Sequence, residues 1–397
     1  MAGRPSVVLA TTHLLWNATL GGHAWVFLNW ALGLQENGAR ITVLERAKRG
    51  SDPETVVDQV RTFRARMAEL GLDLRVALMG SDEELDLLGE AHAVLGDALP
   101  TLNEVHATAD VLLNFRYGLR SPVVDGFRRS LLVDIDPGLL QLWITSGHVT
   151  PTPHDAYVTI GETVGQPGAR VSDCGLSWHH TPPPLYLPAW PVTRAGNHAP
   201  YTTVTNWWGE YEIIDGDNVN NEKRTEFVEN YLDLPARTAA TLELAIYHEP
   251  GHPSDMPMME ENGWRTRPAR EVSASPSEYR RYIQSSRGEF SCAKRSCMAF
   301  ENAWISDRTL CYLASGKPAI VQHTGESRLL PDHSGLLRFR SADEAAAMLT
   351  EVEAHYDDHA AAARALVEEK FDAVEVTRAV LEHAMDIPPR QVSRDRV

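Results

Sequence analysis

The sequence is poor in cysteine, in positive charge and in long apolar runs. Four cysteines among 397 residues are too few for the disulfide framework of a small secreted domain. The net charge of −17 argues against the basic surface that nucleic acids and anionic membranes attract. No apolar run is long enough to span a bilayer, and residues 1–15 show no secretory signal. We therefore expect a cytoplasmic protein without a nucleic-acid or membrane partner.

Several catalytic and metal-binding motifs are also missing. The chain has no G-x-S-x-G elbow, no Walker loop and no G-x-G-x-x-G after a strand. The letters H-E-x-x-H do occur at 248–252, but a proline and a glycine between the histidines break the helix that zinc binding needs. Cys292 and Cys297 lack a second pair, and the D-I-D at 134–136 precedes Pro-Gly, which predicts a turn. No metal site is predicted.

What the chain does contain is an alternation of strand-like and helix-like segments. Apolar residues at 27, 30, 31 and 34, for example, have the spacing of a helix that follows the first strand. Such alternation predicts parallel sheets that are covered by helices. The predicted strands are 6–11, 40–45, 74–79, 111–115, 131–136 and 156–161 in the first half, and 201–208, 242–247, 319–321 and 336–340 in the second.

A segment rich in proline and aromatic residues, 175–200, interrupts this alternation and is interpreted as an interdomain connection. The predicted units are an N-terminal domain at 1–190, a C-terminal domain at 191–375, and a helix with a tail at 376–397. The polar residues 390–397 are expected to be disordered. Ligands of two such domains bind at the carboxyl ends of the strands, in the cleft between the sheets.

The first candidate site is the stretch L-G-G-H at 20–23, between the first strand and the next helix. Gly21 and Gly22 would let a ligand approach the backbone, and the start of a helix favours an anion. His23 would project into the cleft, where it could act as a general base near neutral pH. A tight turn with a capping histidine explains the same residues.

The second candidate is an arginine at the start of a helix. Ser306 is a good N-cap, and Asp307 suits the positive end of the helix dipole. A cation such as Arg308 is disfavoured there unless an anion binds nearby, so a bound phosphate would account for it. A salt bridge to Glu301 or Asp307 is the alternative. The helix should end at Gly316 in a left-handed conformation.

Further candidates lie elsewhere in the second half. A diphosphate would need a second cation, and Lys223 and Lys294 are available, although each alone is explained as a solvated surface lysine. The segment 285–294 is predicted to be a helix end followed by a loop. In that loop Gly288 and Glu289 could approach a sugar or a ribose, because a carboxylate accepts bonds from two neighbouring hydroxyls. An ordinary connecting loop explains them equally well.

Together these passages resemble the GT-B class of nucleotide-sugar glycosyltransferases. The stretch GGHAWVFLNWALGLQENGARITVLE (21–45) is similar to their first glycine loop, helix and strand. LASGKPAIVQHTG (313–325) is similar to their second-domain signature, a helix ending in A-x-G-x-P and a strand before Thr-Gly. A bacterial group of this class shares passages similar to VDIDPG, GEFSCAK and SDRTLCYLASGKP. The resemblance extends over nearly the whole chain and implies two Rossmann-like domains that face a cleft, with C-terminal helices.

The resemblance also implies how substrates bind. The N-terminal domain would hold a small-molecule acceptor, such as a natural product, and the C-terminal domain would hold the nucleotide-diphosphate sugar. His23 would lie near the reacting carbon. Carried over by position, the residues that would line the diphosphate pocket are Gly21, Gly22, Ser306, Arg308, Thr309, Thr324 and Gly325.

The chain departs from the class at one point. Retaining members commonly carry two glutamates separated by seven residues before A-x-G-x-P, and the corresponding positions are Ala303 and Cys311. Glu301 or Glu289 could substitute, and the stereochemical outcome stays open.

The sequence therefore predicts a transferase of hexose or deoxysugar units, with no cofactor and no obligatory metal. His23 would deprotonate the acceptor, and Arg308 with the helix amides would stabilise the leaving diphosphate. A nucleotide-sugar epimerase of the same fold and a non-catalytic nucleotide-binding protein are the alternatives. Interdomain aromatic residues indicate either a flat, apolar acceptor or ordinary packing: Trp178, Tyr186, Trp190, Trp207 and Trp208.

Overall fold

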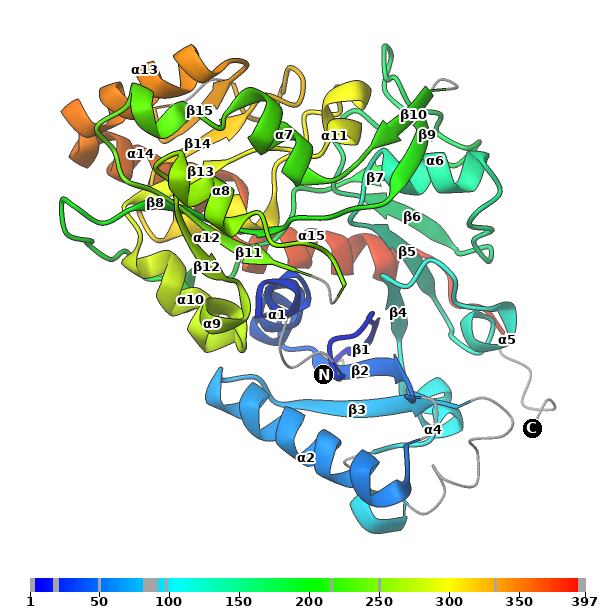
Figure 1. The fold of residues 1–397 in the computed structure, drawn as a ribbon. Coiled ribbons are helices and arrows are strands. Elements are labelled where there is room, and N and C mark those ends of the chain that lie inside the picture. Colours follow the sequence, from blue (N-terminus) through cyan, green and yellow to red (C-terminus); the bar gives the residue numbers. More distant parts are fainter. Residues whose placement is uncertain are drawn as a thin grey trace.

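The computed structural model describes residues 4–16, 21–48, 51–80, 91, 93–96, 99–214, 217–248, 251–331 and 334–391. Two parallel sheets, each covered by helices, dominate the described part (Figure 1). The predicted α/β alternation is thus confirmed. Among the described residues, none of the helices combines the length and the apolar character needed to cross a bilayer.

The N-terminal sheet has seven strands in the order β3-β2-β1-β4-β5-β6-β7. Every residue of β1 is buried, and its neighbours β2 and β4 run parallel to it. Each of the six strands predicted in this half is present. The strands are β1 (Ser6–Ala10), β2 (Arg40–Arg46), β3 (Leu74–Met79), β4 (Val111–Asn114), β5 (Ser130–Asp134), β6 (Ala156–Thr159) and β7 (Trp178–His180). The helices are α1 (Gly21–Glu36), α2 (Pro53–Glu69), α4 (Leu102–Thr108), α5 (Ser121–Val124) and α6 (Leu139–Thr145).

The C-terminal sheet has six strands in the order β12-β11-β8-β13-β14-β15. Its strands are β8 (Tyr201–Asn206), β11 (Leu242–Tyr247), β12 (Arg265–Pro268), β13 (Gly288–Ser291), β14 (Ala319–Gln322) and β15 (Leu336–Phe339). Its helices are α7 (Lys223–Asn230), α8 (Met256–Glu261), α9 (Arg270–Ser273), α10 (Pro276–Ser285), α11 (Arg295–Phe300), α12 (Asp307–Ala314), α13 (Ala342–Ala354) and α14 (Tyr356–Lys370).

One local prediction is wrong, because 288–291 forms the strand β13 and not a loop. All four of its residues are buried between β8 and β14. Gly288 is required there by packing. A Cβ on it would lie 2.5 Å from the Pro318 carbonyl oxygen and 2.5 Å from the Tyr201 ring. The sequence did not predict this strand because it is short and contains a glycine and a glutamate.

A hairpin outside both sheets bridges the domains. It consists of β9 (Tyr211–Ile214) and β10 (Asp217–Asn220) and lies between β8 and α7 in the chain. Ile214 packs with Leu139 of α6, and the indole nitrogen of Trp143 donates to the Glu212 carboxylate at 3.3 Å. The hairpin therefore contacts the N-terminal domain directly (Figure 1).

The last helix, α15 (Ala373–Asp386), returns to the N-terminal domain and packs along α1 (Figure 1). A Cβ on Gly33 would lie 2.4 Å from the Ala373 carbonyl oxygen, so α1 needs a glycine at this crossing. The expected disorder of 390–397 is wrong for Arg390, whose guanidinium binds Asp155 at 2.6 Å. Residues 392–397 lie outside the described part.

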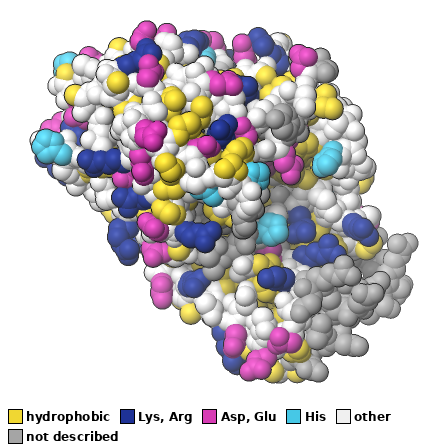
Figure 2. Space-filling model, viewed as in Figure 1, with side chains coloured by type: hydrophobic (Ala, Val, Ile, Leu, Met, Phe, Trp, Pro, Cys, Tyr) yellow, Lys and Arg dark blue, Asp and Glu magenta, His cyan; other side chains and the backbone are white. Residues whose placement is uncertain are grey.

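Charges of both signs are interspersed over the face of the molecule shown in Figure 2. Two of the four interdomain tryptophans, Trp190 and Trp207, are fully buried, whereas Trp178 and Trp208 are half-buried. The Trp190 ring packs against Trp25 of α1 at 4.8 Å between centroids. Core packing therefore accounts for Trp190 and Trp207, and an acceptor would have to bind elsewhere.

Candidate functional site

The carboxyl ends of the two sheets face each other across an interdomain cleft. Asp136 follows β5 on the N-terminal side, and Asp307 begins α12 on the other. Burial, and then the charge of Asp136, raises the pKa of Asp307 to about 6. The two carboxylates are thus close enough to interact. The domains also touch beside them, where the Asn302 side chain donates to the Pro137 carbonyl oxygen at 2.8 Å.

The start of α12 presents backbone amides that no side chain caps. Ser306 occupies the N-cap position, as predicted, but its hydroxyl makes no capping hydrogen bond. The first turn therefore lacks an N-cap side-chain acceptor for its N–H groups and carries the positive end of the helix dipole. Thr309 follows in this turn and is almost fully buried. The helix ends at Gly316 with φ of 69°, which confirms the predicted left-handed stop.

Arg308 lies inside the C-terminal domain and is held by two acceptors. Its Nε donates to Glu289 at 2.7 Å, and a terminal nitrogen donates to the Val204 carbonyl oxygen at 3.0 Å. The salt bridge is therefore made with Glu289, and not with Glu301 or Asp307 as the alternative reading expected. The second Glu289 oxygen is buried without a hydrogen-bond partner among the described residues. The ion pair with Glu289 holds the Arg308 guanidinium beside the first turn of α12.

Lys223 is a mostly buried lysine that forms no salt bridge with another described residue. It begins α7 and is only 8% exposed, so it is not a solvated surface lysine. Within the described part of the chain it makes no hydrogen bond or ion pair. Burial, and then Arg308 and Lys294, lowers its pKa from 10.5 to about 7. Lys294, at the N-cap of α11, is half-buried. Three cationic side chains, Lys223, Lys294 and Arg308, thus lie close enough to interact electrostatically.

The other residues predicted for the donor have structural contacts of their own. Thr324 donates to the Trp304 carbonyl oxygen at 2.7 Å, and a Cβ on Gly325 would lie 2.5 Å from the Glu301 carbonyl oxygen. Both support the loop that leads into α12. Gly288 begins β13, at the opposite end of the strand from the cleft. For these three residues, contact with a ligand stays a prediction.

The two glycines after β1 lie in the first turn of α1, and the loop predicted there begins at residues outside the described part, such as Leu20. A Cβ on Gly21 would lie 2.3 Å from the Ser275 carbonyl oxygen, and one on Gly22 would lie 2.9 Å from the Tyr279 ring. The glycines therefore allow α1 to approach the start of α10 closely. His23 is half-buried, with Nε2 at 2.6 Å from the Thr12 carbonyl oxygen. Its role as a base stays a prediction.

The N-terminal side holds cleft residues that sequence reasoning missed. Burial, then Arg116 and His23, lowers the pKa of His13, so these three side chains gather. The Tyr117 hydroxyl donates to Asp136 at 2.9 Å. His13 follows β1, and Arg116 and Tyr117 follow β4. The rule that ligands bind at the carboxyl ends of parallel strands could have identified all three.

Two cavities near these residues differ greatly in volume. The space between the start of α12 and the ends of β13 and β14 is about 20 Å³, which is too small for a nucleotide in this conformation. A much larger cavity of about 420 Å³ lies between α2 and the loop after β1. Among the described residues, no group of three or more His, Cys, Asp or Glu side chains is placed to hold a metal ion.

Comparison with known proteins identifies the fold. No family model matches the sequence, and no curated protein matches it. The structure is similar to HepE from Anabaena in complex with UDP, with a TM-score of 0.53, 10% identity, and coverage of 96% of this chain and 99% of that chain. It is also similar to TarM, with a TM-score of 0.60, 8% identity, and coverage of 96% and 98%. The chain has the GT-B fold, as predicted.

Proposed function

We propose that the protein is a glycosyltransferase that moves a sugar from a nucleotide-diphosphate sugar to an acceptor. Lys223 is the observation that carries this proposal. An unpaired buried cation is costly, and a bound anion would offset that cost. The uncapped α12 amides and Arg308 lie at the same edge of the sheet, an arrangement suited to a diphosphate. HepE has this fold, and its structures hold UDP, UDP with glucose, and UDP-glucose.

The proposed reaction divides its roles between the two domains. The acceptor oxygen bonds to the anomeric carbon of the sugar, and the bond from that carbon to the diphosphate oxygen breaks. The diphosphate leaves with the bonding electrons, and Lys223, Arg308 and the α12 amides stabilise its charge. The acceptor proton passes to a base on the N-terminal side, for which His23 is our candidate. The cations of the chain itself meet the leaving charge, so the proposal requires no metal.

Opening of the cleft belongs to this proposal. Because the space at α12 is small, we propose that the donor enters while the domains are apart. The closing domains would then exclude water from the diphosphate. The sugar class, a natural-product acceptor and a cytoplasmic location remain predictions of the sequence.

A thermal-shift screen tests the proposal. The purified protein would be scanned with UDP, dTDP, GDP, ADP and NAD, beside Lys223→Met and Lys317→Met. Lys317 is a suitable control because it is also buried but donates to the Thr193 carbonyl oxygen at 2.6 Å, in a separate polar contact. A ligand at 100 times its Kd adds about 2.7 kcal/mol of stability.

We expect one diphosphate to shift the melting of the wild type and of Lys317→Met but not of Lys223→Met. No shift with any nucleotide would contradict the proposal and favour a protein without a nucleotide site. A diphosphate that shifts all three proteins equally would place the nucleotide away from Lys223. Turnover of a nucleotide sugar into an isomer, with no acceptor present, would indicate an epimerase.

A further inference from the structure

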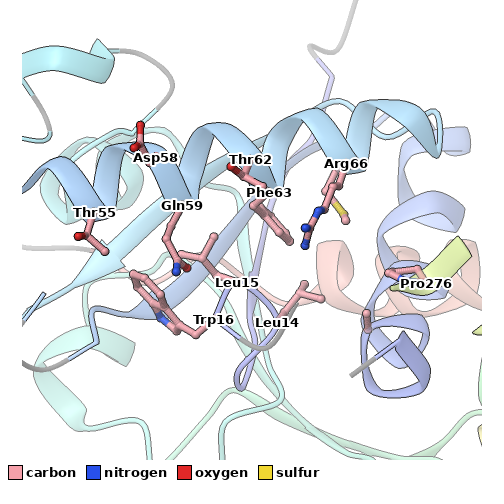
Figure 3. Close-up of a pocket in the computed structure, with 12 residues that line it drawn as sticks. Leu14, Leu15, Trp16, Thr55, Asp58, Gln59, Thr62, Phe63, Arg66 and Pro276 are labelled. Atoms are coloured by element: carbon pink, nitrogen blue, oxygen red, sulfur yellow. The ribbon is translucent and has the colours of Figure 1, made fainter. Parts of the chain in front are cut away.

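The cavity of about 420 Å³ has not been given a role above, and it is lined by residues of four elements, one of which is α1 with Ala24 (Figure 3). The helix α2 forms one wall, the loop after β1 forms the second, and Pro276 at the start of α10 closes one end. The lining residues are Leu14, Leu15, Trp16, Ala24, Thr55, Asp58, Gln59, Thr62, Phe63, Arg66, Met67 and Pro276. This volume is within the usual range for small-molecule sites.

The α2 wall follows from the sequence of the helix. Its lining positions 55, 58, 59, 62, 63, 66 and 67 recur at three- and four-residue spacing, which places them along one side of the helix. Phe63 and Met67 are buried toward the loop, whereas Thr55, Asp58 and Thr62 are exposed along the opening. The pocket thus has an apolar floor and a polar edge.

The loop wall is fixed by hydrogen bonds that its residues donate to Glu45 and to the neighbouring Arg46. The Leu14 amide donates to a Glu45 oxygen at 2.8 Å, and the Thr11 hydroxyl donates to the same oxygen at 2.6 Å. The indole nitrogen of Trp16 donates to the Arg46 carbonyl oxygen at 2.6 Å. These bonds hold Leu14, Leu15 and Trp16 in place without a ligand, so the wall is formed before binding.

The charge of the lining decides which ligand fits. Among the described residues that line it, Asp58 and Arg66 are the only ionisable side chains, and their charges cancel. The site therefore offers no net charge to a nucleotide, a phosphate or a carboxylate. Leucine, phenylalanine, tryptophan and methionine side chains offer apolar contact, and Thr55, Gln59 and Thr62 offer hydrogen bonds at the edge. A neutral molecule with an apolar body and a few hydroxyl groups matches this lining.

The pocket adjoins the N-terminal side of the cleft. Leu14 follows His13 in the chain, and Ala24 follows His23. Pro276 is fixed at the far end, because its carbonyl oxygen accepts from the Trp25 indole nitrogen at 2.9 Å. His13 and His23 do not line the pocket themselves, but each is joined through the backbone to a residue that does, so an apolar body lodged there would lie near both.

We infer that this pocket binds the apolar body of the acceptor, a neutral, largely apolar small molecule that carries the hydroxyl to be glycosylated. The inference rests on the proposed function for the identity of the ligand as an acceptor. The pocket itself is a property of the described residues. Tryptophans Trp190 and Trp207, which suggested such an acceptor at first, are buried in the core and do not form it.

The test uses 2-naphthol, a neutral, flat and fluorescent alcohol, with naphthalene-2-sulfonate as its charged counterpart. Thr62→Trp would fill the pocket from the exposed side of α2. Ala68→Trp is the matched control, because Ala68 is exposed on the same helix and does not line the pocket. Binding is followed by fluorescence titration, and UDP binding to each variant by calorimetry.

We expect the wild type and Ala68→Trp to bind 2-naphthol alike and more tightly than the sulfonate. Thr62→Trp should bind it at least about tenfold more weakly, since the indole would occupy the space. Equal affinity in all three proteins, or a preference for the sulfonate, would overturn the inference. UDP binding should be unchanged in both variants. If the wild type binds none of UDP, dTDP, GDP and ADP while its selectivity for 2-naphthol is kept, the donor proposal is overturned and the apolar site stands.

Discussion

Binding of a diphosphate at Lys223 should take up a proton, and this can be measured. In the free protein burial and two neighbouring cations lower the pKa of Lys223 to about 7, so about half of the molecules are uncharged at pH 7. A dianionic phosphate beside the amine favours the charged form and raises its pKa. Binding should therefore take up roughly half a proton at pH 7 and approach one proton near pH 8.

The affinity for the diphosphate should also depend on pH, and the direction of this dependence can be predicted. Because the charged lysine binds the diphosphate, the affinity should fall as the pH rises above about 7, by up to about tenfold for each pH unit. The phosphate itself is fully ionised in this range, since its second pKa is about 6. Calorimetry in HEPES and in Tris between pH 7 and 9 separates proton uptake from binding, because the two buffers release their protons with different enthalpies.

The stability of the free protein gives a second measure of the lowered pKa of Lys223. A lysine with a lowered pKa binds fewer protons in the folded than in the unfolded protein between pH 7 and 10.5. Its contribution to the free energy of unfolding therefore rises with pH through that window and is least favourable below pH 7. At 1.36 kcal/mol per pH unit the cost is on the order of 5 kcal/mol. Lys223→Met should thus stabilise the free protein at pH 7 while weakening its diphosphate binding.

Lys317→Met provides the control, since burial and Arg287 lower the pKa of Lys317 to about 8 in a contact with the Thr193 carbonyl. It should leave the pH dependence of diphosphate binding unchanged. A wild-type affinity that is flat from pH 7 to 9, or a slope that persists in Lys223→Met, would refute the reasoning.

Three further predictions concern packing and the domain contact. Gly21→Ala should lower the free energy of unfolding by about 1–3 kcal/mol, because its Cβ would meet a carbonyl oxygen at 2.3 Å, whereas Gly118→Ala has open space and should be nearly neutral in the same denaturant titration. Glu289→Gln weakens the pairing of the buried Arg308 and should cost about 3 kcal/mol in thermal unfolding; an unchanged melting temperature would contradict the ion pair. Asn302→Ala removes a bond between the domains and should cost about 1–3 kcal/mol, with a larger radius of gyration in X-ray scattering if the cleft opens.

The fold could be predicted from the sequence because the patterns that identify its strands and helices are local. The strands β3 (74–79) and β11 (242–247) coincide with the predicted runs, since buried parallel strands read as unbroken apolar segments. The strand β13 was missed because a glycine and a glutamate occupy it, and both are explained only by neighbours distant in the chain. Gly288 is required by Tyr201 and Pro318, and Glu289 by Arg308.

The site was accessible only in part. A helix start with Ser306, Asp307 and Arg308 can be recognised from the sequence, but the partner of the arginine cannot, because it lies in another strand. In the sequence, Lys223 cannot be distinguished from a surface lysine, and only the fold shows that it is buried and forms no salt bridge. The glycines at the start of α1 suggested a phosphate loop, and the structure shows them packed against α10. In each case the deciding contact joins segments far apart in the sequence.

The most direct test of the central claim is release of diphosphate from a donor. The purified protein would be incubated with UDP-, dTDP- and GDP-sugars in turn, with 2-naphthol present, and the free nucleoside diphosphate and the naphthyl glycoside would be quantified by chromatography. We predict that one donor yields both products, and that Lys223→Met, still folded, forms them about 100-fold more slowly. No release of diphosphate from any donor, or equal rates in the wild type and in Lys223→Met, would contradict the account.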